Sequence, residues 1–427
     1  MDREALEKLT KDELVDLVLK IQRPAKTSQT SSKPPSTDRK AKRENAKPGG
    51  AKPGHQGHAR SLCETPNKVV EHRPELCEGC GLAFTVDTPG EVIGGYDAID
   101  IPPIQPFVER HTRLSCACLG CGAVTKAGLP EAAAGTPFGP NIRTLAFYFK
   151  HMQHVSYARL QAMFRDVFGL TISQGALCNL LERDGALFAT EREKAVARLR
   201  LAEAVASDET GVRIEGTNAQ HWVFRALEAV VHHMAFSRAG QVVRDMMNGA
   251  KPSFWLSDRY SAQQKHGERH QTCLAHLARD AARVLEVGDE ATGLSLKLWF
   301  KDALALAKEI GVSAESTIKK KHRDLDQRID ALLARTSDCD VTAKVLRKIA
   351  NARDQLLTFL DAPPGLVEPT NNGCERSLRH SVVTEKVTNG FRSFWGAEGS
   401  ADVLTTVDND RLQGQNPYQA IKRVIHA

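Results

Sequence analysis

The spacing of apolar side chains predicts helices in the first half of the chain. Leucine and valine residues within 1–22 recur three and four positions apart, and Thr10-x-x-Glu13 is a candidate capping box in this segment. A helix this short is marginal in isolation, so we expect it either to dock on its own protein or to pair with a partner helix.

Residues 139–200 carry two further apolar stripes, which predict two helices joined by a short turn. The first stripe ends at Gly169, and Ser173 is a candidate N-cap for the second. Such a pair fits a helix-turn-helix that contacts DNA, and it also fits a plain helical hairpin. The side chains expected to face inward are Leu160, Met163, Phe164, Val167 and Phe168 in the first helix, and Leu177, Leu180, Leu181, Leu187 and Phe188 in the second.

From residue 201 the apolar runs become short and partly alternating, which predicts strands. Turn residues at 215–218 and near Glu228 separate these runs, and a helix over 274–286 follows them. Strands followed by helices indicate a mixed α/β fold. The predicted strands are 204–208, 212–215, 222–227, 230–236, 254–257 and 271–273.

Residues 290–362 return to the helical period, with charged residues on the polar faces. The predicted helices are 294–310, 314–335 and 341–360. This block resembles a helical insertion. The tail from Gly399 reads as a helix, a loop at 413–417 and a final helix.

Composition excludes a membrane-spanning protein as the expected class. The 427 residues are 41% hydrophobic, and no apolar run approaches the ~18 residues that a membrane helix needs. The chain opens with charged residues, so we expect no secretory signal.

The net charge of +6 is concentrated in residues 23–60. This segment holds ten Lys or Arg against two Asp or Glu, a local net charge of +8, so the rest of the chain carries about −2. It has no large apolar residue and cannot form a core. Lys47 and Lys52 lie in a Lys-Pro-Gly stretch typical of flexible arms that contact DNA phosphates, although a plain soluble linker has the same composition.

Two Cys-x-x-Cys pairs give the first specific chemical signal, because four thiolates satisfy a tetrahedral Zn²⁺. The pairs are Cys77 with Cys80 and Cys118 with Cys121. The gap between them predicts an additional pair of strands at 92–101 and 107–115. Redox dithiols and unligated core cysteines are the alternatives, and Cys116 and His72 are weaker candidate ligands.

Three acidic residues are candidate Mg²⁺ ligands, since two Mg²⁺ ions held by carboxylates can support phosphoryl transfer on DNA. Asp208 and Asp258 each end a predicted strand, and Glu375 follows Asn371 and Asn372 at the predicted start of a helix. Each also has an ordinary structural explanation. Asp208 fits a turn, Asp258 fits a helix cap, and Glu375 fits an N-terminal helix position or an ion pair with Arg379.

The chain resembles the insertion-sequence-66 family of DDE transposases over nearly its whole length. The similar motifs occur in the family's order. They are Ser31-Ser32-Lys33-Pro34-Pro35-Ser36 and the Lys-Pro-Gly-His stretch, the four cysteines, Asp208-Glu209-Thr210, Ser257-Asp258-Arg259-Tyr260, Cys273-Leu274-Ala275-His276-Leu277, and Asn371-Asn372-x-x-Glu375-Arg376-x-x-Arg379.

The resemblance implies a ribonuclease-H-like mixed-sheet core, interrupted by an all-helical insertion and preceded by a small zinc module and a helical hairpin region. It implies Mg²⁺ or Mn²⁺ on Asp208, Asp258 and Glu375. We expect Arg376, Arg379 and Lys386 to contact DNA phosphates, with ordinary surface charge as the alternative. Cys273 and His276 are expected to support the core or contact DNA, and Glu209 ranks below Asp208 as a ligand.

The implied organisation has eight parts, of which 61–130 is the zinc module and 201–290 opens the catalytic core. The others are the helix 1–22, the basic arm 23–60, the helical region 131–200, the insertion 291–362, the last part of the core 363–405 and the tail 406–427.

The implied activity is DNA strand cleavage and strand transfer at the ends of an insertion sequence. A metal-dependent nuclease or resolvase without strand transfer, and a non-catalytic zinc-dependent DNA-binding protein, are the alternatives. We expect a homo-oligomer on DNA in the bacterial cytoplasm, with the nucleoid, together with accessory proteins of the same element and no membrane partner.

Overall fold

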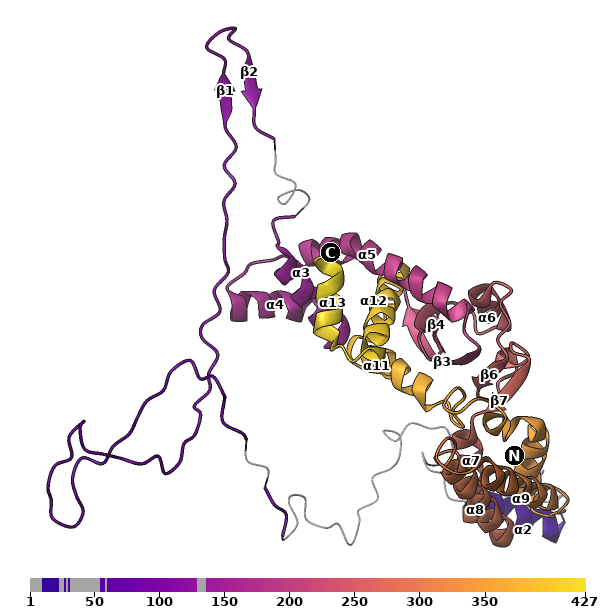
Figure 1. Ribbon diagram of the computed structural model, residues 1–427. Helices are drawn as coiled ribbons and strands as arrows, with labels where there is room; N and C mark the ends of the chain where they lie inside the picture. Colours follow the sequence, from indigo (N-terminus) through magenta and orange to yellow (C-terminus); the bar gives the residue numbers. More distant parts are fainter. Residues whose placement is uncertain (1–9, 23–26, 28–29, 31–53, 58–59, 129–135) are drawn as a thin grey trace. The chain divides into compact units, whose positions relative to one another are not determined.

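The computed structural model describes residues 10–22, 27, 30, 54–57, 60–128 and 136–427. Contacts divide the chain into two units, Lys40–Phe107 and the remaining residues. The helices and strands of Figure 1 belong to the second of these units.

A mixed five-stranded sheet in the order β5-β4-β3-β6-β7 lies at the centre of the larger unit (Figure 1). β3, β4 and β5 are antiparallel, whereas β6 and β7 run parallel to β3. The strands are β3 (Ala204–Ile214), β4 (Thr217–Arg225), β5 (Val230–Ala235), β6 (Phe254–Ser257) and β7 (Arg269–Thr272). This arrangement confirms the mixed α/β class.

The prediction of separate strands at 204–208 and 212–215 is wrong. β3 continues through the polar residues between them, because all of its residues from Ala206 to Ile214 pair with β4. Cross-strand pairing therefore outweighs the weak strand preference of Asp208 and Glu209. The predicted turn after β3 is confirmed at Glu215 and Gly216, which both have positive φ, as a tight hairpin requires.

Helices cover both faces of the sheet. On one face, α5 (Gln174–Arg200) and α6 (Gly240–Met247) bury an aromatic-rich cluster that includes Trp222 and Trp255. On the other face, Cys374 and Leu378 of α11 (Asn372–Thr388) pack on Val223 of β4. α12 (Phe394–Leu412) packs along β5 and against α5.

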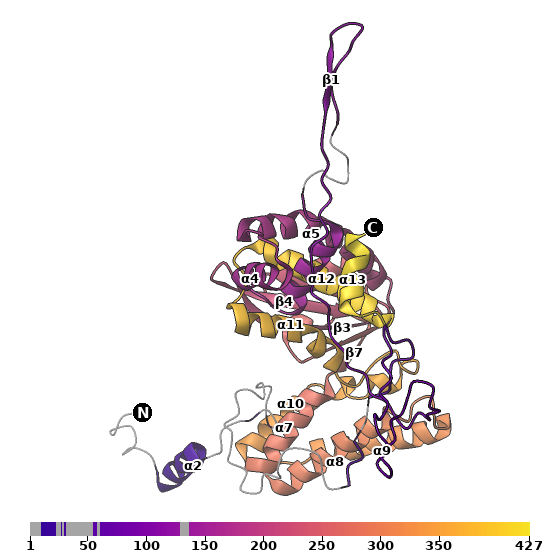
Figure 2. The same ribbon diagram turned by 90° about the vertical axis from the view of Figure 1, so that its left-hand side faces the viewer.

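The helices between residues 140 and 200 share one hydrophobic core with the two C-terminal helices, which lie beside them in Figure 2. It joins α3 (Pro140–Phe147), the π-helical turn Tyr148–Met152, α4 (Tyr157–Phe168) and α5 to α12 and α13 (Pro417–Ile425). The predicted helix end at Gly169 and the N-cap at Ser173 are confirmed, since the Ser173 side chain accepts from the Ala176 N–H at 3.1 Å. Val167 and Leu187 were expected inside but are exposed, because Val167 lies in the last turn of α4 and Leu187 lies at the edge of its apolar stripe.

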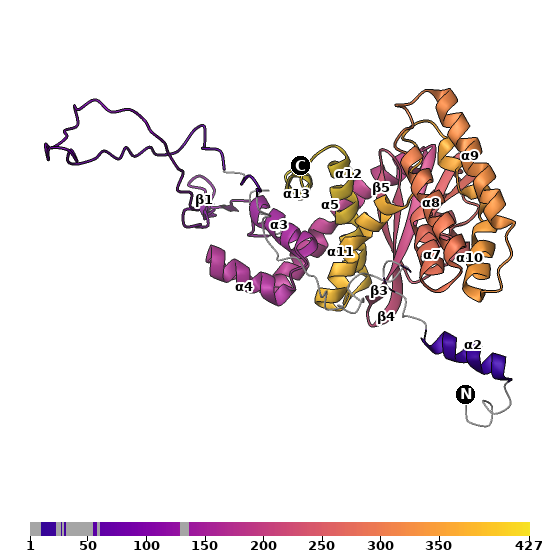
Figure 3. The ribbon, with the colours of Figure 1, turned by 90° about the horizontal axis from the view of Figure 1, so that it is seen from below.

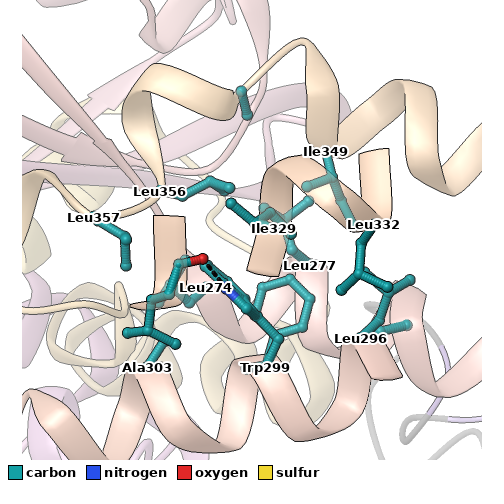
Figure 4. Close-up of a cluster of buried hydrophobic side chains, with 14 of the residues drawn as sticks. Leu274, Leu277, Leu296, Trp299, Ala303, Ile329, Leu332, Ile349, Leu356 and Leu357 are labelled. Carbon is teal, nitrogen blue, oxygen red and sulfur yellow. Dashed lines mark hydrogen bonds between the residues drawn. The ribbon is translucent and has the colours of Figure 1, made fainter. Parts of the chain in front are cut away.

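The four helices after β7 form a second core beside the sheet (Figures 3 and 4). They are α7 (Leu274–Val287), α8 (Glu290–Leu306), α9 (Glu315–Leu333) and α10 (Asp340–Ala350). The predicted helices are confirmed, except that the segment 351–360 forms two 3₁₀ turns instead of extending α10.

Trp299→Phe is expected to lower the free energy of unfolding by about 1–2 kcal/mol. Trp299 is fully buried, and its Nε1–H donates to the Leu325 carbonyl at 2.8 Å (Figure 4), so phenylalanine removes the donor and leaves part of the indole volume unfilled. Urea unfolding followed by circular dichroism measures the change. Trp395→Phe, at a partly exposed position on α12, is the control and should change stability by less than about 0.5 kcal/mol. Equal changes in both variants would contradict the role assigned to this hydrogen bond.

The candidate capping box near the N-terminus is confirmed. The Glu13 N–H donates to the Thr10 hydroxyl at 3.3 Å, and the Thr10 N–H donates to the Glu13 carboxylate at 2.7 Å. α2 (Lys11–Gln22) starts at this point. The first nine residues of the predicted helix lie outside the described residues.

The predicted strands at 92–101 and 107–115 are wrong. Every residue of both segments is described, and only Ser115 is in a strand, as the first residue of β1 (Ser115–Ala117), which pairs with β2 (Val124–Lys126). Val92, Ile93, Phe107 and Val108 are almost fully exposed. Strand preference reflects packing against a neighbouring surface, and these side chains have no such surface.

None of the described helices combines the length and apolar composition that a membrane span requires.

Candidate active site

The sheet places Asp208 and Asp258 side by side. Ala206 of β3 pairs with Leu256 of β6 in parallel register. Asp208 lies two residues after Ala206, and Asp258 lies two residues after Leu256, so the two aspartates are at equivalent positions. Asp208 therefore lies in the middle of β3, not at a strand end as predicted. Parallel pairing with β6 ends just before it, which leaves the two carboxyls at the same edge of this pairing.

Alternation along β3 turns Asp208 towards α11. Ala206 packs against the cluster that contains Cys374 and Leu378 of α11. Successive strand residues face opposite sides, so Asp208 shares the face of Ala206. Glu209 therefore points to the opposite face of the sheet.

The electrostatics show that the acidic residues share one environment. Burial raises the pKa of Asp208 well above its ordinary value, and the charges of Glu209, Asp258 and Glu375 raise it further. A carboxyl that is both buried and surrounded by negative charge is one whose ionised form a bound cation would stabilise. The charges of the other two candidate ligands, Asp258 and Glu375, thus reach the Asp208 carboxyl.

Glu209 is paired away from this cluster. Its carboxylate accepts from Arg238 Nε at 2.8 Å and from the side-chain amide of Gln263. Arg238 also stacks on the ring of Tyr260, 4.0 Å from the ring centroid. Through these contacts Glu209 holds the loop that follows β6. Because its carboxylate is already paired, Glu209 is a poor candidate for a metal ligand.

The residues before Glu375 anchor the start of α11 to the sheet and to α7. The side-chain amide of Asn371 donates to the Ser207 carbonyl at 2.8 Å, and the Asn371 N–H donates to Cys273 Sγ at 3.1 Å. Asn371 is buried, whereas Asn372 is the exposed first residue of the helix. Cys273 itself is fully buried, and its role in supporting the core stays a prediction.

The Glu375 carboxylate contacts α7. It accepts from Arg279 at 3.3 Å and lies 3.8 Å from His276 Nε2. Burial and the neighbouring Arg279 lower the pKa of His276, so it faces Glu375 as a neutral ring. These contacts, not an ion pair with Arg379, fix the carboxylate.

Arg279 was missed by sequence reasoning. It lies three residues after His276, so the two share a helical face, and that spacing was the available signal. Within the described ranges, the buried Nδ1 of His276 has no hydrogen-bond partner.

The residue types fit a divalent cation, because carboxylate oxygens are the ligands that Mg²⁺ prefers. In the part of the chain that the structure describes, no three His, Cys, Asp or Glu side chains are grouped closely enough to hold a metal ion. The three carboxylates therefore share an electrostatic environment without forming a ready ligand shell.

The predicted cationic contacts divide into two sets. Arg376, Arg379 and Lys386 are exposed on α11, and Arg379 and Lys386 follow Glu375 at helical spacing on one face. Lys47 and Lys52 lie outside the described residues.

Each Cys-x-x-Cys pair forms its own turn. In the unit Lys40–Phe107, the Cys77 N–H donates to the Leu82 carbonyl and the Gly81 N–H donates to the Cys77 carbonyl, both at 2.8 Å. Hydrogen bonds from the N–H groups of Gly79 and Cys80 lower the pKa of Cys77.

The second pair repeats this geometry in the larger unit. The Cys118 N–H donates to the Ala123 carbonyl and the Gly122 N–H donates to the Cys118 carbonyl, again both at 2.8 Å. Backbone N–H groups of Cys121 and Gly120 lower the pKa of Cys118. Both turns therefore favour a thiolate at the first cysteine of the pair.

Comparison with known proteins identifies the family. The model described as "Transposase IS66 family" matches residues 135–399, which contain all three carboxylates and well over half of the chain. The chain is also similar to the "Uncharacterized protein y4jD" of Sinorhizobium fredii, with 22% identity across 87% of this chain and 79% of that protein. The chain therefore belongs to the IS66 family of transposases.

Proposed function

We propose that this transposase catalyses metal-dependent strand cleavage and strand transfer at the ends of an insertion sequence. The observation that carries the proposal is the convergence of Asp208, Asp258 and Glu375 from β3, the end of β6 and α11, where the charges of Asp258 and Glu375 act on the buried Asp208 carboxyl. Phosphoryl transfer on DNA needs carboxylates in such a cluster to hold divalent cations.

Asp208, Asp258 and Glu375 would hold Mg²⁺ or Mn²⁺, and DDE transposase membership implies divalent metal use in general. When bound, such ions activate the attacking oxygen and stabilise the leaving oxygen. The protein's own contribution is positioning. Arg279 and His276 hold the Glu375 carboxylate, and the Asn371 contacts fix the start of its helix.

Exposed cations would bind the DNA backbone. Arg376, Arg379 and Lys386 lie on the helix that carries Glu375, so phosphates that contact them would be held near the carboxylates. We assign Lys47 and Lys52 of the basic arm to sequence-independent phosphate contacts.

We further propose that the sheet is a ribonuclease-H-like core and that residues 291–362 are an insertion in it. The support is the sheet order, with three antiparallel strands followed by two parallel ones, and the position of α7–α10 between the strands and α11 in the sequence. The DNA substrate would place the protein in the bacterial cytoplasm with the nucleoid, as a homo-oligomer on element ends and with accessory proteins of the same element.

Incubation of the protein with labelled element ends, a target plasmid and Mg²⁺ tests the proposed activity. We expect cleaved ends and joined products, both lost when EDTA is added. Nicked DNA without joined products would favour the nuclease or resolvase alternative. Binding without cleavage would favour the non-catalytic one.

We also propose that Cys77, Cys80, Cys118 and Cys121 bind one Zn²⁺. The support is the matched geometry of the two turns, each of which lowers the pKa of its first cysteine.

Purified protein is expected to contain about one zinc per chain, because four thiolates complete one tetrahedral site. Replacing Cys118 and Cys121 by serine should remove the zinc, as measured by atomic absorption. Cys63→Ser is the matched control, since Cys63 is an exposed cysteine outside both pairs. Unchanged zinc content in the double variant would refute the site.

A further inference from the structure

A chain of buried polar side chains ties α11 to the sheet and to α12. His221 of β4 bonds through Nδ1 to the Ser381 hydroxyl of α11, and through Nε2 to His232 Nδ1 of β5 at 2.9 Å. His232 Nε2 lies 3.1 Å from the Asp408 carboxylate of α12. All four residues are buried, and both histidines are fully so.

The hydrogen bonds of this chain have one consistent direction. A carboxylate only accepts, and a neutral imidazole has one donor and one acceptor nitrogen. His232 Nε2–H therefore donates to Asp408, His221 Nε2–H donates to His232 Nδ1, and the Ser381 hydroxyl donates to His221 Nδ1. Every polar atom that takes part in these three bonds is satisfied when both rings are neutral.

The pKa of His221 agrees with a neutral ring at that position. Burial lowers the pKa of His221 well below its ordinary value. Burial alone would raise the pKa of Asp408, but hydrogen bonds from His232 and Ser377 and the charge of Arg411 hold it below its ordinary value. Arg411 donates to the free oxygen of Asp408 at 3.0 Å.

Two of the contacts belong to the same face of α11. Ser377 and Ser381 are four residues apart, so both hydroxyls face the network, and Ser377 stands two residues after Glu375. At a rise of ~1.5 Å per residue, Ser377 lies only about 3 Å along the axis from Glu375. A rotation of α11 that broke these contacts would also move the Glu375 carboxylate.

The network is not a nucleophilic relay, although serine, histidine and aspartate occur in it in sequence. Ser381 is 2% exposed and both rings have no exposed surface, so no substrate can reach the hydroxyl. The hydrogen bonds of the network therefore hold α11 in place and do not take part in a reaction. The contacts of Asn371 fix where α11 starts, whereas Ser377 and Ser381 lie roughly two to three turns further along and fix the rotation of the helix about its axis.

We propose that Ser381, His221, His232 and Asp408 form a positioning network that sets the rotation of α11 and thereby places the Glu375 carboxylate beside Asp208. This inference rests on the proposed metal-binding role of Glu375. It predicts that loss of a buried hydroxyl more than one helical turn from the carboxylate changes metal affinity.

Ser381→Ala is expected to weaken Mn²⁺ binding and to lower kcat for strand cleavage, each by about tenfold, with KM for DNA unchanged. Isothermal titration calorimetry measures the affinity, at a temperature where circular dichroism shows the variant to be fully folded. Ser381→Thr keeps the hydroxyl and should restore both values. Ser377→Ala, which removes the second contact from the same helix, should act in the same direction.

Thr342→Val is the matched control. It also removes a buried hydroxyl, one that accepts from the Asp289 N–H at 2.9 Å in the helical block away from α11. We expect it to lower stability while Mn²⁺ affinity and kcat stay at wild-type values. If Ser381→Ala lowers only stability, as Thr342→Val does, the network is a structural feature and the proposal is overturned.

Glu375→Gln separates this failure from failure of the proposed function. If Glu375→Gln weakens Mn²⁺ binding and Ser381→Ala does not, only the positioning proposal is lost. If Glu375→Gln leaves Mn²⁺ affinity unchanged, the proposed metal site is wrong and the positioning proposal falls with it.

Discussion

Glu375→Gln is expected to lower the rate of strand cleavage by about a thousandfold while DNA affinity changes little. Glutamine keeps the size of the side chain and can still contact Arg279, but it removes the negative charge that a divalent cation requires. The loss of charge also reduces repulsion of DNA phosphates, so binding should not weaken. A gel-based cleavage assay and a binding titration without metal measure the two effects separately.

Glu228→Gln is the control for this substitution. Glu228 is exposed in the turn between β4 and β5, so the same chemical change there should leave cleavage within about twofold of wild type. Cleavage that survives in Glu375→Gln would show that the acidic cluster is not the catalytic site. A parallel loss of DNA binding would show instead that Glu375 acts through the fold of α11.

The sequence predicted best those features that depend on local chemistry. Gly169, Ser173 and the Thr10-x-x-Glu13 box each mark a helix boundary found in the structure, because capping depends on residues within one turn. The turn at Glu215 and Gly216 is confirmed for the same reason.

Features that depend on distant partners were harder to predict. The strand preferences at 92–101 and 107–115 were real, but strands form only where another surface accepts their side chains. Asp208 seemed to end a strand because its neighbours are polar, whereas pairing with β4 carries β3 past it. In both cases the contact that decides the structure involves residues far away in the sequence.

The candidate site divides in the same way. Asp208, Asp258 and Glu375 could be singled out as residues, but their convergence depends on the parallel register of β3 with β6 and on the docking of α11. The contact of Arg279 with Glu375 joins residues 96 positions apart. The two aspartates are 50 residues apart, and each residue of β3 pairs with the residue of β6 that is 50 positions later. The spacing of the aspartates therefore indicates proximity only once this register is known.

Gly390→Ala is expected to lower the free energy of unfolding by about 3 kcal/mol. Gly390 has a φ of 90°, and an added Cβ would collide with the backbone carbonyl of Arg213 on β3. That carbonyl accepts from the Phe391 N–H at 2.8 Å, so the glycine lets the turn between α11 and α12 lie directly on the sheet. The substitution should push this turn away from β3 and free the C-terminal end of α11.

Gly399→Ala is the matched control for the glycine substitution. Gly399 lies within α12, and an added Cβ there would meet no atom within 4 Å. Alanine at that position should stabilise the protein by about 1 kcal/mol through helix propensity. Opposite signs for the two variants in urea unfolding would locate the effect in the contact with Arg213. A stabilising Gly390→Ala would mean that the C-terminal end of α11 does not pack on β3 in solution. The helix that carries Glu375 at its N-terminal end would then lack one of the contacts that hold it in place.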